Sequence, residues 1–425
     1  MSLSGSARVS VVNLGCRVNR VELDLIASQL LSAGCELVDQ AEAEAIVVNS
    51  CAVTAEAEAK TRKTIRHAAH LPQAPAVVAT GCVASLFKDE LQELAPNVVV
   101  EPDKTRVAER VLETLGLDAT SVLDTGELAQ SPTPTGRSRP GIKVQDGCDN
   151  RCTYCIVWKA RGQGRSLASG RVIEAVQEAV ARGAHEVVLT GINLGQYHTE
   201  DASRKMDLTD LLDEIQAQTT IERIRLSSIE PPDVTERLLE HMAASGGRVA
   251  PFLHICLQSG CDATLARMGR AYTTADFAAR VEAARRLVPQ IAIGTDLIVG
   301  FPGETDADFD ASLAFCEQMS FAKMHIFRYS KRPGTPAATM QHQVEPHIMA
   351  ERSRRLRHLA DVMRAQEAAR HVGEKDLVLV EYPGRGVSGG LFDVLVDPRL
   401  EVGSMVEVKL IGCTPDGRLK GTLLA

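Results

Sequence analysis

The sequence predicts an α/β protein in three parts: an N-terminal domain built on a parallel sheet, a central partial (β/α)6 barrel, and a small C-terminal β-barrel. Two observations predict this fold. Apolar strands alternate with helical segments through most of the 425 residues, which favours parallel sheets. From residue 372 on, short alternating strands are instead separated by glycine-rich turns, as in an all-β domain. A chain of this length is expected to form two or three domains.

The composition, 44% hydrophobic and 24% charged residues, is that of a soluble globular protein. The apolar runs are too short to span a bilayer, and residues 1–8 lack the apolar segment of a secretory signal. Eleven cysteines in such a chain indicate a reducing cytoplasm, where thiols serve metals or cores. The net charge of −8 means that any contact with RNA must come from a local patch.

Residues 1–120 are predicted to form the first domain, with strands at 9–13, 45–49, 76–80 and 98–100. Its first helix, at 19–32, carries apolar residues on one face and ends at Gly34. Cys16, Cys51 and Cys82 each follow a strand and precede a helix. Since parallel strands end at one edge of a sheet, these thiols are expected to converge there and could hold an iron–sulfur cluster. The alternative is three separate buried cysteines. Cys35 is predicted to lie in the core, and Cys316 and Cys413 are predicted to be packing residues.

A basic segment follows Cys51 and reads A-K-T-R-K-T-I-R-H-A-A-H. Its cations, at one-turn spacings on a predicted helix, are Lys60, Arg62, Lys63 and Arg66. The segment is either a solvated face or a contact for a phosphate backbone. Residues 121–140 are rich in proline, serine and threonine and are predicted to be a linker.

The barrel is predicted over residues 141–371, with strands at 142–144, 186–189, 223–226, 252–257, 291–299 and 322–327. A long helix at 346–371 is expected to pack along it. The barrel begins with Q-D-G-C-D-N-R-C-T-Y-C, in which Cys148, Cys152 and Cys155 have C-x3-C-x2-C spacing. Three thiolates on one loop can bind three irons of a [4Fe–4S] cluster and leave the fourth open. A zinc knuckle or a redox pair is the weaker alternative. A structural zinc site usually has two C-x2-C pairs or paired histidines, and a redox pair has one isolated C-x2-C motif.

The C-x3-C-x2-C motif resembles the radical S-adenosylmethionine (SAM) signature. Together with L-G-C-R-V-N, N-S-C-A-V-T, G-C-V-A, L-Q-S-G-C-D, D-L-I-V-G-F-P-G-E-T and Y-S-K-R-P-G-T-P-A-A, it makes essentially the whole chain resemble the radical SAM methylthiotransferases. The motifs look most like the branch that acts on threonylcarbamoyladenosine in tRNA. The C-terminal residues 372–425 resemble the TRAM domain, an RNA-binding module. In residues 373–425, however, Asp and Glu outnumber Lys and Arg by eight to six. Strong phosphate binding there would therefore need a local face on which the positive charges are concentrated.

The resemblance implies two [4Fe–4S] clusters: a radical-generating one on Cys148, Cys152 and Cys155, and an auxiliary one on Cys16, Cys51 and Cys82 that carries the sulfur. One SAM would donate the methyl group and a second would give the radical that attacks C2 of the adenine. The implied SAM-pocket residues are Tyr154, Gly191, Asn193, Ser227, Glu230, His254 and Gln258. The implied partners are tRNA, a sulfur donor, and a reductase or flavodoxin-type electron donor, with no membrane.

The chain departs from the family's usual residues at three places. Trp158 and Lys159 stand where proline and tyrosine are usual, and Cys256 and Arg328 stand where proline is frequent. Trp158 could stack on a base or fill a domain interface; with Arg161 and the basic segment it completes the candidate substrate contacts. The alternatives to a tRNA enzyme are the same chemistry on a protein or peptide, a two-cluster electron-transfer protein, and a zinc-stabilised RNA-binding barrel.

Overall fold

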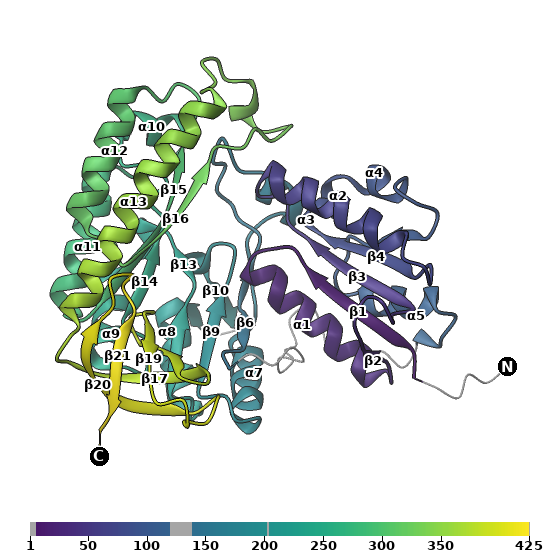
Figure 1. Cartoon of the computed structure of the whole chain (residues 1–425), viewed down its shortest axis with the longest axis horizontal. Helices are drawn as coiled ribbons and strands as arrows, with labels where there is room; N and C mark the ends of the chain where they lie inside the picture. The colour runs from purple at the N-terminus through teal and green to yellow at the C-terminus, as the bar shows by residue number, and fades with distance from the viewer. Residues whose placement is uncertain (1–5, 120–137, 202–203, 425) are drawn as a thin grey trace. The chain divides into compact units, whose positions relative to one another are not determined.

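The computed structural model of the protein describes residues 6–119, 138–201 and 204–424, and the chain divides into two compact units (Figure 1). The first unit comprises residues 1–136, 141–150 and 155–167, and the second comprises residues 137–140, 151–154 and 168–425. Most of the predicted linker at 121–140 lies outside the described residues. The domain boundaries expected from the sequence stay predictions, and each unit is described by itself.

A five-stranded parallel sheet in the order β2-β1-β3-β4-β5 forms the centre of the first unit. Its strands are β1 (Arg8–Asn13), β2 (Glu36–Leu37), β3 (Ala45–Ser50), β4 (Ala76–Gly81) and β5 (Val98–Val100). Four of these confirm the predicted strands. The fifth, β2, has only two residues, which is too short to give a sequence pattern.

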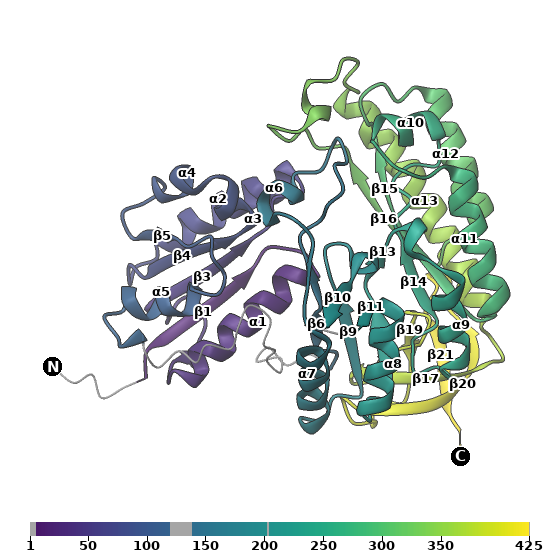
Figure 2. The same ribbon diagram turned by 180° about the vertical axis from the view of Figure 1, so that it is seen from behind.

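Helices cover both faces of this sheet, because β3 is apolar on both sides. Ile46 and Val48 pack against one group of helices, and Ala45 and Val47, which point the other way, pack against another. Figure 2 shows α2 and α4 along one face and α1 and α5 along the other. The helices are α1 (Arg17–Ser32), α2 (Ala55–Ala69), α3 (Cys82–Leu86), α4 (Lys88–Gln92) and α5 (Val107–Thr114).

The first unit also contains the segments on either side of the C-x3-C-x2-C loop. They are β6 (Gly141–Lys143), β7 (Gln145–Asp146), α6 (Val157–Arg161) and β8 (Arg165–Ser166). β7 and β8 pair antiparallel, with Gln145 opposite Ser166 and Asp146 opposite Arg165. This short ladder fixes both ends of the loop.

The second unit alternates parallel strands with helices, as predicted. Its principal strands are β9 (Glu186–Thr190), β12 (Arg223–Leu226), β14 (Phe252–Ile255), β15 (Ala292–Val299) and β16 (Lys323–Arg328). β9 pairs parallel with β12, and β13 (Ser228–Ile229), β14, β15 and β16 form a parallel sheet in that order. The intervening helices are α7 (Ser169–Ala181), α8 (Leu208–Gln218), α9 (Glu236–Ala244), α10 (Asp262–Arg267), α11 (Thr274–Leu287) and α12 (Asp306–Met319).

Helix starts in this unit follow local sequence rules. Asp207, Thr273 and Thr305 are the N-cap residues of α8, α11 and α12, and each forms a capping box with an aspartate three residues later. An antiparallel hairpin, β10 (His198–Asp201) with β11 (Arg204–Asp207), was not predicted. The long helix α13 (Pro346–Arg370) confirms the predicted helix and packs along β15 and β16.

The C-terminal residues form a closed β-barrel with strand order β17-β18-β19-β21-β20. The strands are β17 (Lys375–Tyr382), β18 (Arg385–Val387), β19 (Asp393–Leu395), β20 (Met405–Cys413) and β21 (Leu419–Leu423). Val378, Val380, Val394, Val408 and Leu419 are buried inside it. The predicted fold class, with its parallel-sheet N-terminal part, its α/β centre and its C-terminal β-barrel, is confirmed.

Every helix that the structure describes is too short or too polar to cross a lipid bilayer.

Candidate functional site

The structure brings Cys16, Cys51 and Cys82 to one edge of the first unit's sheet. Cys16 is the N-cap residue of α1, Cys51 follows β3 directly, and Cys82 is the first residue of α3. Because β1, β3 and β4 are parallel neighbours, their carboxyl ends lie side by side. Cys35, by contrast, is buried in the core on one face of the sheet, as predicted.

Gly81 allows the third cysteine to come close to the second. Its φ of +89° lies in the left-handed region, and a Cβ atom there would be 2.4 Å from the Ser50 carbonyl oxygen and 2.4 Å from Asn49 Oδ1. Any residue with a side chain would therefore push the Cys82 turn away from the Cys51 turn. The glycine in the T-G-C motif is required by this close approach.

Polar side chains of the cysteine motifs bind the three turns together. Asn19 Nδ2 donates to Asn49 Oδ1 at 3.1 Å and to the Ser50 carbonyl at 2.7 Å. Asn49 Nδ2 donates to the Asn19 carbonyl at 2.6 Å, and Ser50 Oγ accepts from Val83 N at 3.2 Å. The Cys16 thiol donates to Asn19 Oδ1 at 3.0 Å. The asparagines in L-G-C-R-V-N and N-S-C thus position the thiols.

The three thiols are close enough to influence one another's ionisation. Burial, with smaller contributions from Cys16 and Cys82, raises the pKa of the Cys51 thiol to about 11. Cys16 is exposed to solvent, yet desolvation by the protein groups around it still raises the pKa of its thiol, and the charge of Arg161 opposes this. Thiols in such a place ionise when a metal binds them. Three converging thiols at a sheet edge fit a cluster held by three protein ligands.

The second set of cysteines lies on the C-x3-C-x2-C loop. Gly147, just before Cys148, has a φ of +70°, and a Cβ atom there would be 1.9 Å from the Gln163 carbonyl oxygen, so the loop can start only with glycine. Cys148 N donates to the Gly162 carbonyl at 3.2 Å, and Cys155 Sγ accepts from Val157 N at 3.4 Å. Both thiols belong to the first unit. The motif's three thiol donors also suit a [4Fe–4S] cluster.

Cys152 belongs to the second unit, where Arg270 holds its sulfur. Arg270 Nη1 donates to Cys152 Sγ at 3.0 Å, and Arg270 Nη2 forms an ion pair with Glu230 at 2.7 Å. Arg270 Nε donates to the hydroxyl of Tyr272 at 3.0 Å. The Arg270 side chain is only 3% exposed. The sequence interpretation missed this residue, because an arginine after a short helix gives no signal of its own.

If Cys152 binds the radical-generating cluster, as the resemblance implies, removing the Arg270 guanidinium is expected to slow SAM cleavage, because a hydrogen bond to a cluster sulfur raises the cluster's reduction potential. We expect Arg270→Met to lower the rate of 5′-deoxyadenosine formation by about tenfold or more and to shift the potential downward. An EPR-monitored redox titration measures the potential. Arg267→Met is the matched control, since Arg267 pairs with Asp308; equal losses in both variants would contradict this role.

The predicted SAM-pocket residues lie in the second unit, mostly just beyond strand ends. Gly191 and Asn193 follow β9, Ser227 follows β12, and Gln258 follows β14. Asn193 and Ser227 are buried, and Ser227 Oγ has no hydrogen-bond partner among the described residues. A buried hydroxyl without a partner is expected to bind a ligand's polar group. These polar residues beyond the strand ends are suited to bind a polar cofactor.

The other three predicted pocket residues already have partners. Glu230 pairs with Arg270, and His254 Nε2 contacts Asp296 Oδ1 at 2.9 Å. The Tyr154 ring packs edge-on against Phe301, with centroids 6.3 Å apart. Their assignment to a SAM pocket stays a prediction.

One predicted substrate contact, Arg161, is held in buried ion pairs. The Arg161 side chain is 2% exposed, and its Nη1 lies 2.8 Å from both Glu22 Oε1 and Asp146 Oδ1. Burial raises the pKa of Glu22, but Arg161, Lys104 and Lys143 outweigh it and hold this pKa well below its usual range. Arg161 Nη2 also donates to Asn19 Oδ1 at 3.2 Å. This geometry favours a positioning role for Arg161 at the first cysteine set over contact with a substrate.

The remaining substrate candidates differ in exposure. Arg62 forms ion pairs with Glu58 and Glu90, each at 2.8 Å. Lys60, Lys63 and Arg66 are exposed on α2, and none of the three forms an ion pair with another described residue. Their spacing of three residues places them on one helix face. Trp158 is half-buried, with the Lys159 ammonium 5.2 Å from its ring centroid.

The chain is similar in sequence to several known proteins. Residues 142–316 match the radical SAM superfamily, and residues 8–101 match the uncharacterized protein family UPF0004. The chain is 37% identical to the threonylcarbamoyladenosine tRNA methylthiotransferase MtaB of Thermotoga maritima, over 90% of this chain and 88% of that protein.

Two further relatives are each 33% identical. They are the tRNA-2-methylthio-N(6)-dimethylallyladenosine synthase of Sphingopyxis alaskensis, with 96% of this chain and 95% of that protein covered, and the ribosomal protein uS12 methylthiotransferase RimO of Desulforudis audaxviator, with 96% of each covered. A solved structure of the radical SAM methyltransferase TsrM from Kitasatospora setae matches 78% of this chain and 75% of that one, with a TM-score of 0.55 and 18% identity. That likeness concerns the fold.

Proposed function

The chain belongs to the radical SAM methylthiotransferase family, and from this premise we propose that it inserts a methylthio group at C2 of N6-threonylcarbamoyladenosine next to the tRNA anticodon. The observation that supports this acceptor is the identity of 34–37% to relatives named for that activity, against 30–35% for relatives named for dimethylallyladenosine and 33% for one named for a ribosomal protein. Val18 in the motif G-C-R-V-N also favours the threonylcarbamoyladenosine branch.

The cofactors of this family are [4Fe–4S] clusters and SAM. When bound, they supply the radical that removes hydrogen from C2 of the adenine and the methylated sulfur that replaces it. We propose that Cys148, Cys152 and Cys155 bind the radical-generating cluster. The auxiliary cluster is assigned to the first unit's other set of thiols, Cys16, Cys51 and Cys82. Three thiol ligands per cluster leave one iron of each open.

The chain's own side chains then have separate tasks. Asn19 and Ser50 hold the auxiliary cysteine turns in place through the hydrogen bonds described above. Arg270 stabilises the Cys152 sulfur, and Ser227 offers a buried hydroxyl to SAM. A reductase or flavodoxin-type protein would supply electrons, and a separate sulfur donor would renew the sulfur.

The exposed basic face of α2, defined by Lys60, Lys63 and Arg66, is the proposed contact for the tRNA phosphate backbone. The chain as a whole carries a net charge of −8, so attraction of a polyanion needs a local cluster of cations such as this one. Arg62 is excluded from the face because Glu58 and Glu90 neutralise it.

Neutralising this face is expected to weaken tRNA binding uniformly. In the variant with Lys63→Ala and Arg66→Ala, the slope of log affinity against log salt concentration should fall by about one for each phosphate group that the variant no longer binds. Fluorescence anisotropy with unmodified tRNA over a range of salt concentrations measures this slope. Arg354→Ala on α13 is the control, because its side chain is 72% exposed and pairs with Glu351. An unchanged slope in the double variant would place the tRNA elsewhere.

The proposed function is tested by mass spectrometry of nucleosides from the tRNA of a strain that lacks this gene and any enzyme of overlapping activity. We expect 2-methylthio-threonylcarbamoyladenosine to disappear, its unthiolated precursor to accumulate, and a plasmid copy of the gene to restore it. Loss of 2-methylthio-dimethylallyladenosine instead would identify dimethylallyladenosine as the acceptor of this enzyme. If neither nucleoside changes, the tRNA proposal is wrong and ribosomal peptides become the place to search for the acceptor.

A further inference from the structure

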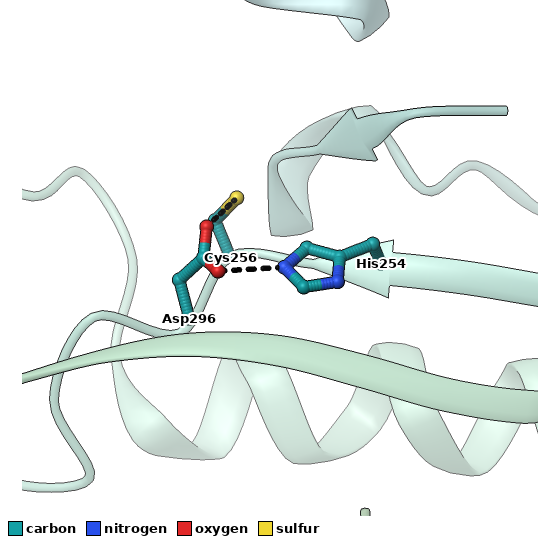
Figure 3. A group of neighbouring side chains, drawn as sticks. All are labelled: His254, Cys256 and Asp296. Atoms are coloured by element: carbon teal, nitrogen blue, oxygen red, sulfur yellow. Dashed lines mark hydrogen bonds and ion pairs between the residues drawn. The ribbon is translucent and has the colours of Figure 1, made fainter. Parts of the chain in front are cut away.

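Four side chains with metal-binding donors meet on one face of the second unit's parallel sheet. His254 is on β14, Cys256 follows that strand, Asp296 is on β15, and His325 is on β16. His254 and Cys256 are two residues apart and therefore point to the same side, and Asp296 is directly opposite His325 in the register. Figure 3 shows His254 and Cys256 both directed at the Asp296 carboxylate.

The separations between these donors are close to those of a metal site. His254 Nε2 is 2.9 Å from Asp296 Oδ1, and Cys256 Sγ is 3.8 Å from Asp296 Oδ2. The ligand atoms of His254, Cys256 and Asp296 all lie within 4.8 Å of one another. With usual zinc–nitrogen and zinc–sulfur bond lengths, tetrahedral ligand atoms are about 3.3–3.6 Å apart. Small movements of the side chains would therefore place all three around one ion.

His325 provides a fourth donor. Its Nδ1 is 3.1 Å from Asp296 Oδ1, and its ring centroid is 5.1 Å from that of His254. The His325 and Asp296 side chains are 49% and 23% exposed, whereas His254 is 10% exposed. The group is thus open to solvent on one side and anchored on the other, which gives an ion a path of entry.

We propose that His254, Cys256, Asp296 and His325 bind one divalent transition-metal ion of the zinc class. Two imidazoles, one thiolate and one carboxylate are a donor set that suits zinc and not the harder magnesium or calcium ions. On binding, the Cys256 thiol loses its proton to solvent as the metal–sulfur bond forms. His254 binds the ion through Nε2 and keeps its proton on Nδ1. His325 binds the ion through Nδ1 and keeps its proton on Nε2.

A simpler account would make this group only a carboxylate held by two histidines. That account explains His254, Asp296 and His325, but it gives no role to the thiol. The thiol adds a soft ligand to a group that already contains two imidazole nitrogens and a carboxylate.

The inference is independent of the proposed acceptor and is tested through metal content and coordination. The holoenzyme with its iron–sulfur clusters is incubated with excess zinc sulfate, freed of unbound zinc by gel filtration, and analysed for zinc and iron. Zinc-edge X-ray absorption then reports the ligands separately from iron. We expect about one zinc per chain, with one sulfur at about 2.3 Å and three nitrogen or oxygen ligands at about 2.0–2.2 Å.

Two variants and a control identify the ligands. Cys256→Ser should remove the sulfur from the zinc shell and weaken zinc binding by at least about tenfold, since loss of even an outer partner often has that effect. If Cys256→Ser folds poorly, His325→Gln provides a second test: this change at a half-exposed position should weaken zinc binding to a similar extent. Cys413→Ser, in the C-terminal barrel, should change neither measurement.

Either of two results would overturn the inference. One is a wild-type holoenzyme, with its full iron content, that retains no zinc after gel filtration. The other is a zinc shell with two or more sulfurs that Cys256→Ser leaves unchanged, because such zinc would sit on the cluster cysteines.

Discussion

Replacing Cys16 by alanine is expected to abolish methylthio transfer while reductive SAM cleavage continues at close to the wild-type rate. Cys16 belongs to the set of thiols at the edge of the first unit's sheet, whereas radical formation is assigned to the cysteines of the C-x3-C-x2-C loop. Loss of one thiol from a set of three leaves too few ligands for a cluster. Product formation should therefore fall below detection, and 5′-deoxyadenosine should still accumulate.

The measurement is liquid chromatography with mass spectrometry of both products in one anaerobic reaction. Cys35→Ala is the matched control, because Cys35 lies in the same unit but in the core away from the sheet edge; this variant should retain both activities. Cys152→Ala should lose both. Undiminished methylthio transfer by Cys16→Ala would show that these thiols hold no essential cluster.

Replacing Glu186 by glutamine is expected to destabilise the second unit strongly. Glu186 is fully buried and pairs with two buried arginines, Arg223 at 2.5 Å and Arg225 at 2.7 Å. Each arginine also donates to carbonyl groups of the C-terminal barrel: Arg223 to Leu377 and Arg225 to Gly389. This cluster therefore joins the barrel to the parallel strands β9 and β12, and the glutamine would leave two buried positive charges uncompensated.

Breaking a buried ion pair by removing one partner costs about 3–5 kcal/mol, which corresponds to a fall of about 10²- to 4 × 10³-fold in the protection of backbone amides. Native-state hydrogen exchange with mass spectrometry on peptides that cover β12 and β17 measures this fall. The control is Glu222→Gln, a 47% exposed carboxylate one residue before Arg223, which should change protection little. Equal protection in the wild type and Glu186→Gln would contradict the structural role of the cluster.

The same cluster has a defined pH dependence. Burial raises the pKa of Glu186, but Arg225 and Arg223 outweigh this and lower the pKa to about 2. Because the folded-state pKa is below the unfolded value of about 4.3, the stabilisation is fully present above that value and is lost as the pH falls toward 2. The difference in stability between the wild type and Glu186→Gln should shrink over this interval.

Much of the fold could be predicted because its signals are local. Runs of apolar residues marked β1, β3, β4 and β5, and a one-sided apolar pattern that ends at Gly34 marked α1, to within a few residues. The six cysteines stood out for the same reason, since each lies in a short sequence motif that follows a strand. The missed elements include β2, β7, β8, β10, β11 and β13, which are short or lie in hairpins, where pairing with a neighbour and not a pattern along the chain makes the strand.

The sequence by itself determined the element order, the two sets of cysteines and the family. Only the tertiary structure decided the partners of the charged and polar side chains. Arg161 and Arg62 looked like free cations, but Glu22 and Glu90 neutralise them from distant parts of the chain. Arg270 gained its importance from Cys152, 118 residues away. Apolar periodicity can be recognised from residues that are neighbours in the sequence. The energy of a charge depends instead on which groups the fold places beside it.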